Sequence, residues 1–268
     1  MYTVKKFPYG TFSWADLIST DQAAAREFYT QLMGWGTADV PMGNDQMYTF
    51  FTVDGHNVGA VGPMPQQMRD HGHPSVWNNY ITVDDVDALV DKVTAAGGKV
   101  IAPPFDVFDN GRMMTVQDPS GGTVCFWQPK KSIGAGMVNG TGAMIWNELN
   151  TWDAAAATAF YETVIGWTFD KDPNIDYWYI KNNGRYNGGI LQMSKEAHGD
   201  LPSAWIVYYN VADIDATVAK TKELGGQVMT EIMEAQNAGR FALLVDPTGG
   251  TFMAMQGNSP DQWDLNGE

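Results

Sequence analysis

The sequence predicts an α+β protein made of two tandem halves, and three observations lead to this fold class. The stretch WADLISTDQAAAREFYTQLMGW at residues 14–35 recurs as WNELNTWDAAAATAFYETVIGW at residues 146–167. Many residues between Pro74 and Gln128 recur at a spacing of 128 residues. Each half also alternates strand-like and helix-like segments in the order βαβββ, twice over. A repeat of this length indicates a duplicated unit rather than one large domain.

Each half begins with a strand and a capped helix. Residues 11–18 alternate in character, which predicts a strand. Asp21 is a good N-cap because its carboxylate can accept from the free amides of the first helical turn. The alanines after it favour a helix over residues 22–33. Three short strands are expected next, separated by the turn-rich sequences MGND and DGHN, at residues 35–40, 47–53 and 57–61.

The second module of the first half follows the same order. Residues 76–83 predict a strand, Asp85 a helix start, and Gly97-Gly98 a helix end, because glycine readily adopts the left-handed conformation found there. Three strands complete the module, at residues 99–102, 112–117 and 123–127. Asp153 and Asp213 are the corresponding caps of the second half. The expected domains are residues 8–130 and 138–258, with a connector at 63–74 and a Gly-rich linker at 131–140.

Composition indicates an ordinary globular protein and excludes several function classes. The chain has 268 residues, of which 44% are hydrophobic and 18% charged. Its net charge of −15 argues against nucleic acid as a partner; we interpret it as favouring solubility, with a cationic ligand as the alternative. One cysteine, Cys125, rules out an internal disulfide and a Cys-rich zinc site. We expect no membrane partner and a cytoplasmic location, because MYTVKKFPYG lacks the apolar core of a signal peptide.

The repeated helix starts and strand turns resemble a known superfamily. D-x-x-x-A-x-x-F-Y begins at Asp21 and Asp153, D-D-V-D occupies residues 84–87, and D-P-x-G begins at Asp118 and Asp246. These motifs resemble the vicinal oxygen chelate superfamily, which includes glyoxalase I, bleomycin-resistance proteins and extradiol dioxygenases. Phe-Tyr followed by Gly-Trp is similar to its two-domain bacterial glyoxalases or hydroxylases. The resemblance implies two glyoxalase-like domains, each with a cupped mixed sheet.

The resemblance also implies where a metal would be bound in each cup. Counted from the capping acids and from D-P-x-G, the ligand places are Trp14, Asn78 and Cys125 in the first half and Trp146, Ile206 and Met253 in the second. Residues 59–61 and 189–191 hold the remaining places, and none is a His or Glu. Such metals need imidazole, carboxylate or thiolate donors. We therefore expect no metal and no cofactor, with a divalent metal as the alternative.

Strand alternation predicts which side chains line the cups. Trp14 and Asp16 are expected to point the same way, with Leu17 facing the helices as core. The predicted ligand-binding residues are Trp14, Asp16, Asn78, Tyr80, Cys125, Trp127, Trp146, Glu148, Tyr208 and Met253. A wall of aromatics with one or two carboxylates is typical of a site for a flat apolar or cationic ligand. The alternative is that the tryptophans merely fill a cup that has lost its metal.

Three functions are compatible with this pattern. The first is a metal-free protein of the bleomycin-resistance type that binds a small aromatic or cationic molecule. The second is a lyase, isomerase or oxygenase of the glyoxalase/dioxygenase type, with Asp16 or Glu148 as the catalytic candidate, since burial raises a carboxyl pKa toward neutrality. The third is an interaction protein with vestigial cups. Monomer and homodimer both remain open.

The first cup is expected to be the selective one, because Asn78 and Cys125 make it more polar. Glu148 would then remain at a rim or between the halves. Arg112 and Arg240 are interpreted as members of strand-edge ion pairs, with an anionic substrate group as the alternative. His71 and His73 are interpreted as surface residues rather than a metal pair.

Overall fold

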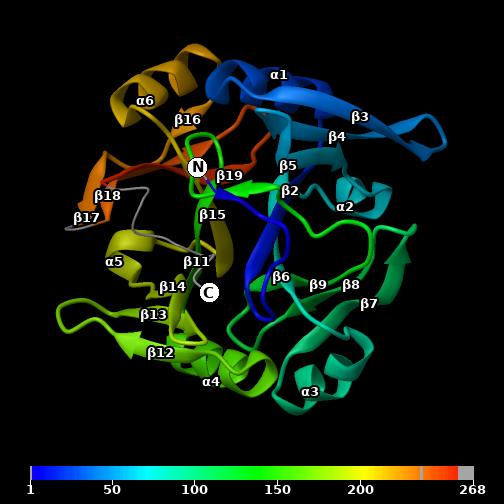
Figure 1. Ribbon diagram of the computed structural model, residues 1–268. Coiled ribbons are helices and arrows are strands. Elements are labelled where there is room, and N and C mark those ends of the chain that lie inside the picture. The colour runs from blue at the N-terminus through cyan, green and yellow to red at the C-terminus, as the bar shows by residue number, and fades with distance from the viewer. Residues whose placement is uncertain (1, 236–237, 259–268) are drawn as a thin grey trace.

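The computed structural model describes residues 2–235 and 238–258 and shows two large mixed sheets, one from each half (Figure 1). The first sheet has the strand order β3-β4-β5-β2-β6-β9-β8-β7. Its strands are β2 Phe12–Ser19, β3 Gly36–Gly43, β4 Gln46–Val53, β5 His56–Pro63, β6 Val76–Thr82, β7 Lys99–Val107, β8 Gly111–Gln117 and β9 Thr123–Pro129. The predicted fold class is confirmed.

The second sheet has the order β12-β13-β14-β11-β15-β19-β18-β16, and β17 pairs with β18. Its strands are β11 Met144–Thr151, β12 Thr168–Lys171, β13 Tyr177–Asn182, β14 Arg185–Gln192, β15 Ala204–Asn210, β16 Gln227–Val228, β17 Met233–Ala235, β18 Gly239–Val245 and β19 Thr251–Gly257. Each sheet is built wholly from one half, so neither cup exchanges modules with the other.

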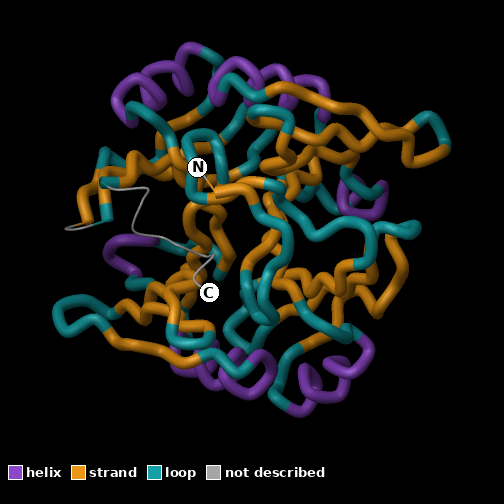
Figure 2. The backbone as a smooth tube through the Cα atoms, in the orientation of Figure 1, coloured by secondary structure: helices purple, strands orange, loops and turns teal. Residues whose placement is uncertain are grey.

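The longer helices lie at two opposite ends of the molecule, with strands between them (Figure 2). At one end α1 (Gln22–Met33) contacts α6 (Ile214–Glu223), and at the other α3 (Val90–Ala95) contacts α4 (Ala154–Ile165). Each contact therefore joins the two halves. The remaining helices are η1 Asp87–Leu89, α2 Gln66–Asp70 and α5 Lys195–His198.

The predicted helix caps form as expected. Asp21 accepts a hydrogen bond from the Ala24 amide at 3.0 Å, and Asp153 from the Ala156 amide at 2.9 Å. Helix α1 ends at Gly34, whose φ of 68° lies in the left-handed region that favours glycine.

Three segments differ from the sequence-based expectations. The connector contains α2, and β7 extends to Val107, past the expected end at residue 102. The Gly-rich segment before the second half is packed rather than flexible. Its strand β10 (Met137–Val138) is buried and pairs with β1 (Tyr2–Thr3), and the Ala135 amide donates to the Ser13 carbonyl at 2.8 Å.

The two halves share one core, arranged around two matching hydrogen-bond chains. The Trp77 indole donates to the Tyr29 hydroxyl at 2.8 Å, and that hydroxyl donates to Asp246 of the other half at 2.9 Å. In the corresponding chain of the other half, Trp205 donates to Tyr161, and Tyr161 donates to Asp118, at the same distances. All these side chains are buried.

Leu17 also contacts the opposite half. It is fully buried, and a Cβ placed on Gly250 would lie 2.8 Å from Leu17 Cδ1. Leu17 is therefore a core residue, as predicted, and it lies against the second half. None of the described helices is both long enough and apolar enough to span a membrane.

Candidate functional site in the first cup

Asp16 on β2 is the polar centre of the first cup, and its side chain is only 7% exposed. It accepts hydrogen bonds from Asn78 Nδ2 at 2.9 Å and from the Tyr48 hydroxyl at 2.8 Å. The Tyr80 hydroxyl lies 3.1 and 3.2 Å from its two carboxylate oxygens. Strand register explains the arrangement, because Asp16 pairs directly with Asn78 on β6 and Trp14 with Tyr80.

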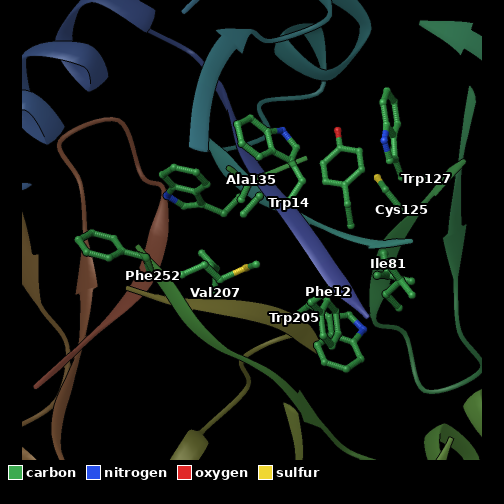
Figure 3. Packing of buried hydrophobic residues seen from close by; sticks show 14 of the residues in the cluster. Phe12, Trp14, Ile81, Cys125, Trp127, Ala135, Trp205, Val207 and Phe252 are labelled. Atoms are coloured by element: carbon green, nitrogen blue, oxygen red, sulfur yellow. The ribbon is translucent and has the colours of Figure 1, made fainter. Parts of the chain in front are cut away.

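Aromatic rings form the walls above this carboxylate. The Trp14 indole donates to the Tyr48 hydroxyl at 3.2 Å, and its ring centroid lies 5.9 Å from that of Phe50. On the other side the rings of Tyr80 and Trp127 are 6.4 Å apart in an edge-on arrangement. Trp14, Cys125 and Trp127 project from the same side of the sheet (Figure 3). The cup thus offers apolar faces around one carboxylate.

Small residues accommodate the rings of this wall. Ala60 on β5 pairs with both Asp16 and Phe50, and a Cβ on Gly62 would lie 3.1 Å from the Tyr48 ring. Gly111 lies beneath Trp127 and allows the indole to lie flat against β8, since a Cβ there would be 2.2 Å from the ring.

Burial controls the acid–base state of Asp16. Loss of hydration raises the pKa of this carboxyl, and the hydrogen bonds from Asn78, Tyr48 and Tyr80 lower it in part. No cation is among the causes of the pKa shift. The charge of the ionised form is therefore balanced by neutral donors.

Cys125 is a buried thiol rather than a reactive one. Its Sγ lies 3.4 Å from the Thr115 hydroxyl, and burial raises the pKa of the thiol to about 12. Because the thiolate is the nucleophile, Cys125 is a poor nucleophile near neutral pH.

The second cup repeats the frame with fewer polar groups. The Trp146 indole donates to the Tyr177 hydroxyl at 3.0 Å. Tyr208 and Tyr177 are hydrogen-bonding neighbours of Glu148, whose pKa is raised by burial. Glu148 is 7% exposed, so the expectation that it lies at a rim is wrong, and its hydrogen-bonding neighbours belong to its own half. Ile206 and Met253 stand where the first cup has Asn78 and Cys125.

Sequence reasoning missed three residues of these cups: Tyr48, Phe50 and Tyr177. Tyr48 and Phe50 alternate on β4, which the sequence shows as QMYTFFTV. That alternation was the available signal. The sequence does not show that β5 pairs with β2, or that β4 pairs with the other edge of β5.

The donor chemistry of the cups does not fit the metal that the resemblance implies. Among the described residues, no three His, Cys, Asp or Glu side chains come together as a metal-binding group. Of the implied ligand places only Cys125 carries an imidazole, carboxylate or thiol group. An iron, manganese or zinc centre requires several such donors. The side chains at the implied ligand places therefore do not suit such a metal.

The remaining candidates lie outside the cups. Arg112 Nε contacts Asp87 at 2.7 Å, and Arg240 contacts Asp215 at 2.7 Å, as expected for strand-edge ion pairs. His71 and His73 are exposed, as expected. A separate cavity of about 200 Å³ is lined by Pro8, Thr11, Asn182, Asn183, Arg185, Tyr186 and Asn187.

Comparisons with known proteins agree with this architecture. Residues 11–126 match the Glyoxalase/Bleomycin resistance protein/Dioxygenase superfamily, and residues 147–255 match a Glyoxalase-like domain. The chain is 44% identical over 251 residues to "Putative glyoxylase CFP32" of Mycobacterium tuberculosis, covering 92% of this chain and 95% of that protein. It is 34% identical over 268 residues to "Anthracycline biosynthesis protein DnrV" of Streptomyces peucetius, covering 94% of each.

Solved structures support the fold. The 2,3-dioxygenase LapB from Pseudomonas sp. KL28 has a TM-score of 0.64 at 12% identity, with 94% of each chain covered. The Mn(II)-bound glyoxalase from Novosphingobium aromaticivorans has a TM-score of 0.62 at 16% identity, covering 96% of this chain and 86% of that one. Since both halves match family descriptions and full-length relatives exceed 30% identity, the chain belongs to the glyoxalase/bleomycin resistance protein/dioxygenase superfamily, also called the vicinal oxygen chelate superfamily.

Proposed function

We propose that the first cup binds a flat aromatic molecule by stacking and hydrogen bonding, without a metal and without breaking a bond. The observation that carries the proposal is the Asp16 network, which occupies the centre of the cup beneath Trp14 and Phe50. Flat ring systems gain from such walls by burial and offset stacking. A few placed polar groups within an apolar wall supply selectivity.

The names of two relatives support an aromatic ligand. Both Streptomyces proteins are described as anthracycline biosynthesis proteins, and anthracyclines are flat fused-ring compounds. We propose that a molecule of that shape stacks on Trp14 or Trp127, with its hydroxyl or carbonyl groups directed toward Asn78 and Asp16. We infer that this chain takes a ligand of the same general shape.

An enzyme of the glyoxalase or dioxygenase type is the second candidate. The observation that favours it is the raised pKa of Asp16, which suits a general base near neutral pH. Against it, three neutral donors already occupy the carboxylate oxygens. These hydrogen bonds lower the pKa of Asp16 in part and so weaken it as a base.

Titration with 1,4-dihydroxyanthraquinone, a neutral fused-ring probe, tests the proposal. We expect saturable binding to the full chain, at least tenfold weaker in Trp14→Ala, with the probe recovered unchanged by chromatography. Trp152→Ala, at an indole outside both cups that donates to the Leu201 carbonyl, is the matched control and should bind normally. Conversion of the probe that is lost in Asp16→Asn would favour the enzyme. Equal binding by wild type and Trp14→Ala would contradict the proposal.

A further inference from the structure

The two cups differ at one position that decides how their carboxylates are satisfied. Asn78 pairs directly with Asp16 across β2 and β6, and its amide donates to that carboxylate at 2.9 Å. In the second half Ile206 pairs in the same way with Glu148 across β11 and β15. An isoleucine side chain has no donor, so the corresponding hydrogen bond to Glu148 is missing.

Glu148 therefore has acceptor capacity left inside an apolar site. An ionised carboxylate can accept about four hydrogen bonds. The side chains that hydrogen-bond to it are Tyr208 and Tyr177, and Tyr177 already accepts from Trp146. Both phenols stay neutral, because burial raises the pKa of each well above its ordinary value. A buried carboxylate without a cation carries a large desolvation cost, which an incoming positive charge would relieve.

The surroundings of Glu148 favour an organic cation over a metal ion. Trp146, Tyr177 and Tyr208 place aromatic rings beside the carboxylate, and Phe241 lies 6.0 Å from the Tyr208 ring. The faces of such rings attract ammonium groups. Ile206 and Met253 supply apolar surface and no hard oxygen donors. The net charge of −15 also raises the local concentration of cations around the chain.

We propose that the second cup is a separate binding site for an organic ammonium ion attached to an apolar body, with the ammonium N–H donating to Glu148 the hydrogen bond that Ile206 cannot supply. Tyr177 and Tyr208 hold the carboxylate, and Ile206 and Met253 contact the apolar part of the ligand. The chain then has two sites of different selectivity: a neutral aromatic site around Asp16 and a cationic site around Glu148.

The test compares two probes of equal shape, 1-naphthylmethylamine, which is an ammonium ion at pH 7, and neutral 1-naphthalenemethanol. Calorimetric titration of the full chain should show the amine binding at least tenfold more tightly than the alcohol. Glu148→Gln keeps the size of the side chain and should abolish this preference. Glu162→Gln removes one exposed charge from α4 and should leave the preference unchanged, which separates the local carboxylate from net charge.

Exchanging the distinguishing residue gives a second, independent test. Ile206→Asn supplies Glu148 with the missing amide and should weaken amine binding at least tenfold, even where Glu148→Gln fails to fold. Equal affinity for amine and alcohol, or unchanged amine binding in Ile206→Asn, would overturn the proposal. Amine binding that is lost in Trp14→Ala but kept in Trp146→Ala would place the cation in the first cup and overturn it as well. Binding of the anthraquinone probe at Trp14 is unaffected by any of these outcomes.

Discussion

At the scale of single residues, Asp16 is the most sensitive group of the first cup. Its carboxylate lies between neutral phenol and amide donors, and burial raises its pKa. In the unfolded chain the same carboxyl returns to the ordinary aspartate pKa of about 3.9. The folded protein therefore holds this proton more tightly than the unfolded chain does.

We expect Asp16→Asn to flatten the pH dependence of stability. Where the folded state binds more protons, stability falls as pH rises. For Asp16 this fall begins near the unfolded pKa of about 3.9 and ends above the raised folded pKa. Urea unfolding at several pH values above 4 should show a smaller decline in the variant than in the wild type. A decline that Asp16→Asn leaves intact would contradict the assignment.

Trp14 and Leu17 lie on opposite faces of β2. Their alanine variants should therefore differ: one should lose probe binding and the other unfolding free energy. Leu17→Ala should cost about 2–5 kcal/mol of unfolding free energy, because it removes buried contacts at the junction of the halves. Trp14→Ala should affect mainly the binding of the anthraquinone probe. Denaturant unfolding and probe titration of both variants measure the two effects. If Trp14→Ala loses as much stability as Leu17→Ala and binds normally, the role of Trp14 is structural.

At the scale of elements, the position of Trp127 in the first cup depends on its close contact with β8. A Cβ at Gly111 would lie 2.2 Å from the indole, so Gly111→Ala must displace Trp127. Overpacking of this kind costs about 1–3 kcal/mol. We expect weaker probe binding in the first cup with the second cup unchanged, as measured by titration with both probe types. Normal anthraquinone binding in Gly111→Ala would show that Trp127 takes no part in the site.

The sequence predicted elements with local signals and missed those without them. Asp21 and Gly34 specify the ends of α1 chemically, so the helix was predicted correctly. Helix α2 was missed because the preceding Pro65 makes no side-chain cap hydrogen bond. The strand at Met137 was missed because its Gly-rich sequence was interpreted as a linker, although the strand is buried.

The candidate site was partly predictable for the same reason. Alternation on a single strand placed Trp14 and Asp16 on one face without any knowledge of neighbouring strands. Tyr48 belongs to β4, which is two strands away from β2 in the sheet. The burial of Glu148 likewise depends on pairing between distant strands, which one sequence does not specify.

At the scale of the whole molecule, the two halves form one cooperative unit. Tyr29 and Tyr161 each carry a buried hydrogen bond into the opposite half. Tyr29→Phe leaves the Trp77 indole without its acceptor, at a cost of about 1–3 kcal/mol. We expect a single, shifted transition in calorimetry, and the same shift for Tyr161→Phe. Two separate transitions in either variant would show that the halves unfold independently.

The shared core also sets an order of events during protein synthesis. The first sheet is complete at Pro129, but Asp246 is added roughly 10 s later at usual translation rates. During that interval Tyr29 and Trp77 lack the second-half residues that cover them in the finished protein. The nascent first half therefore keeps part of its aromatic core uncovered until Asp246 has been added, and the shared core is completed only when the second half has been synthesised.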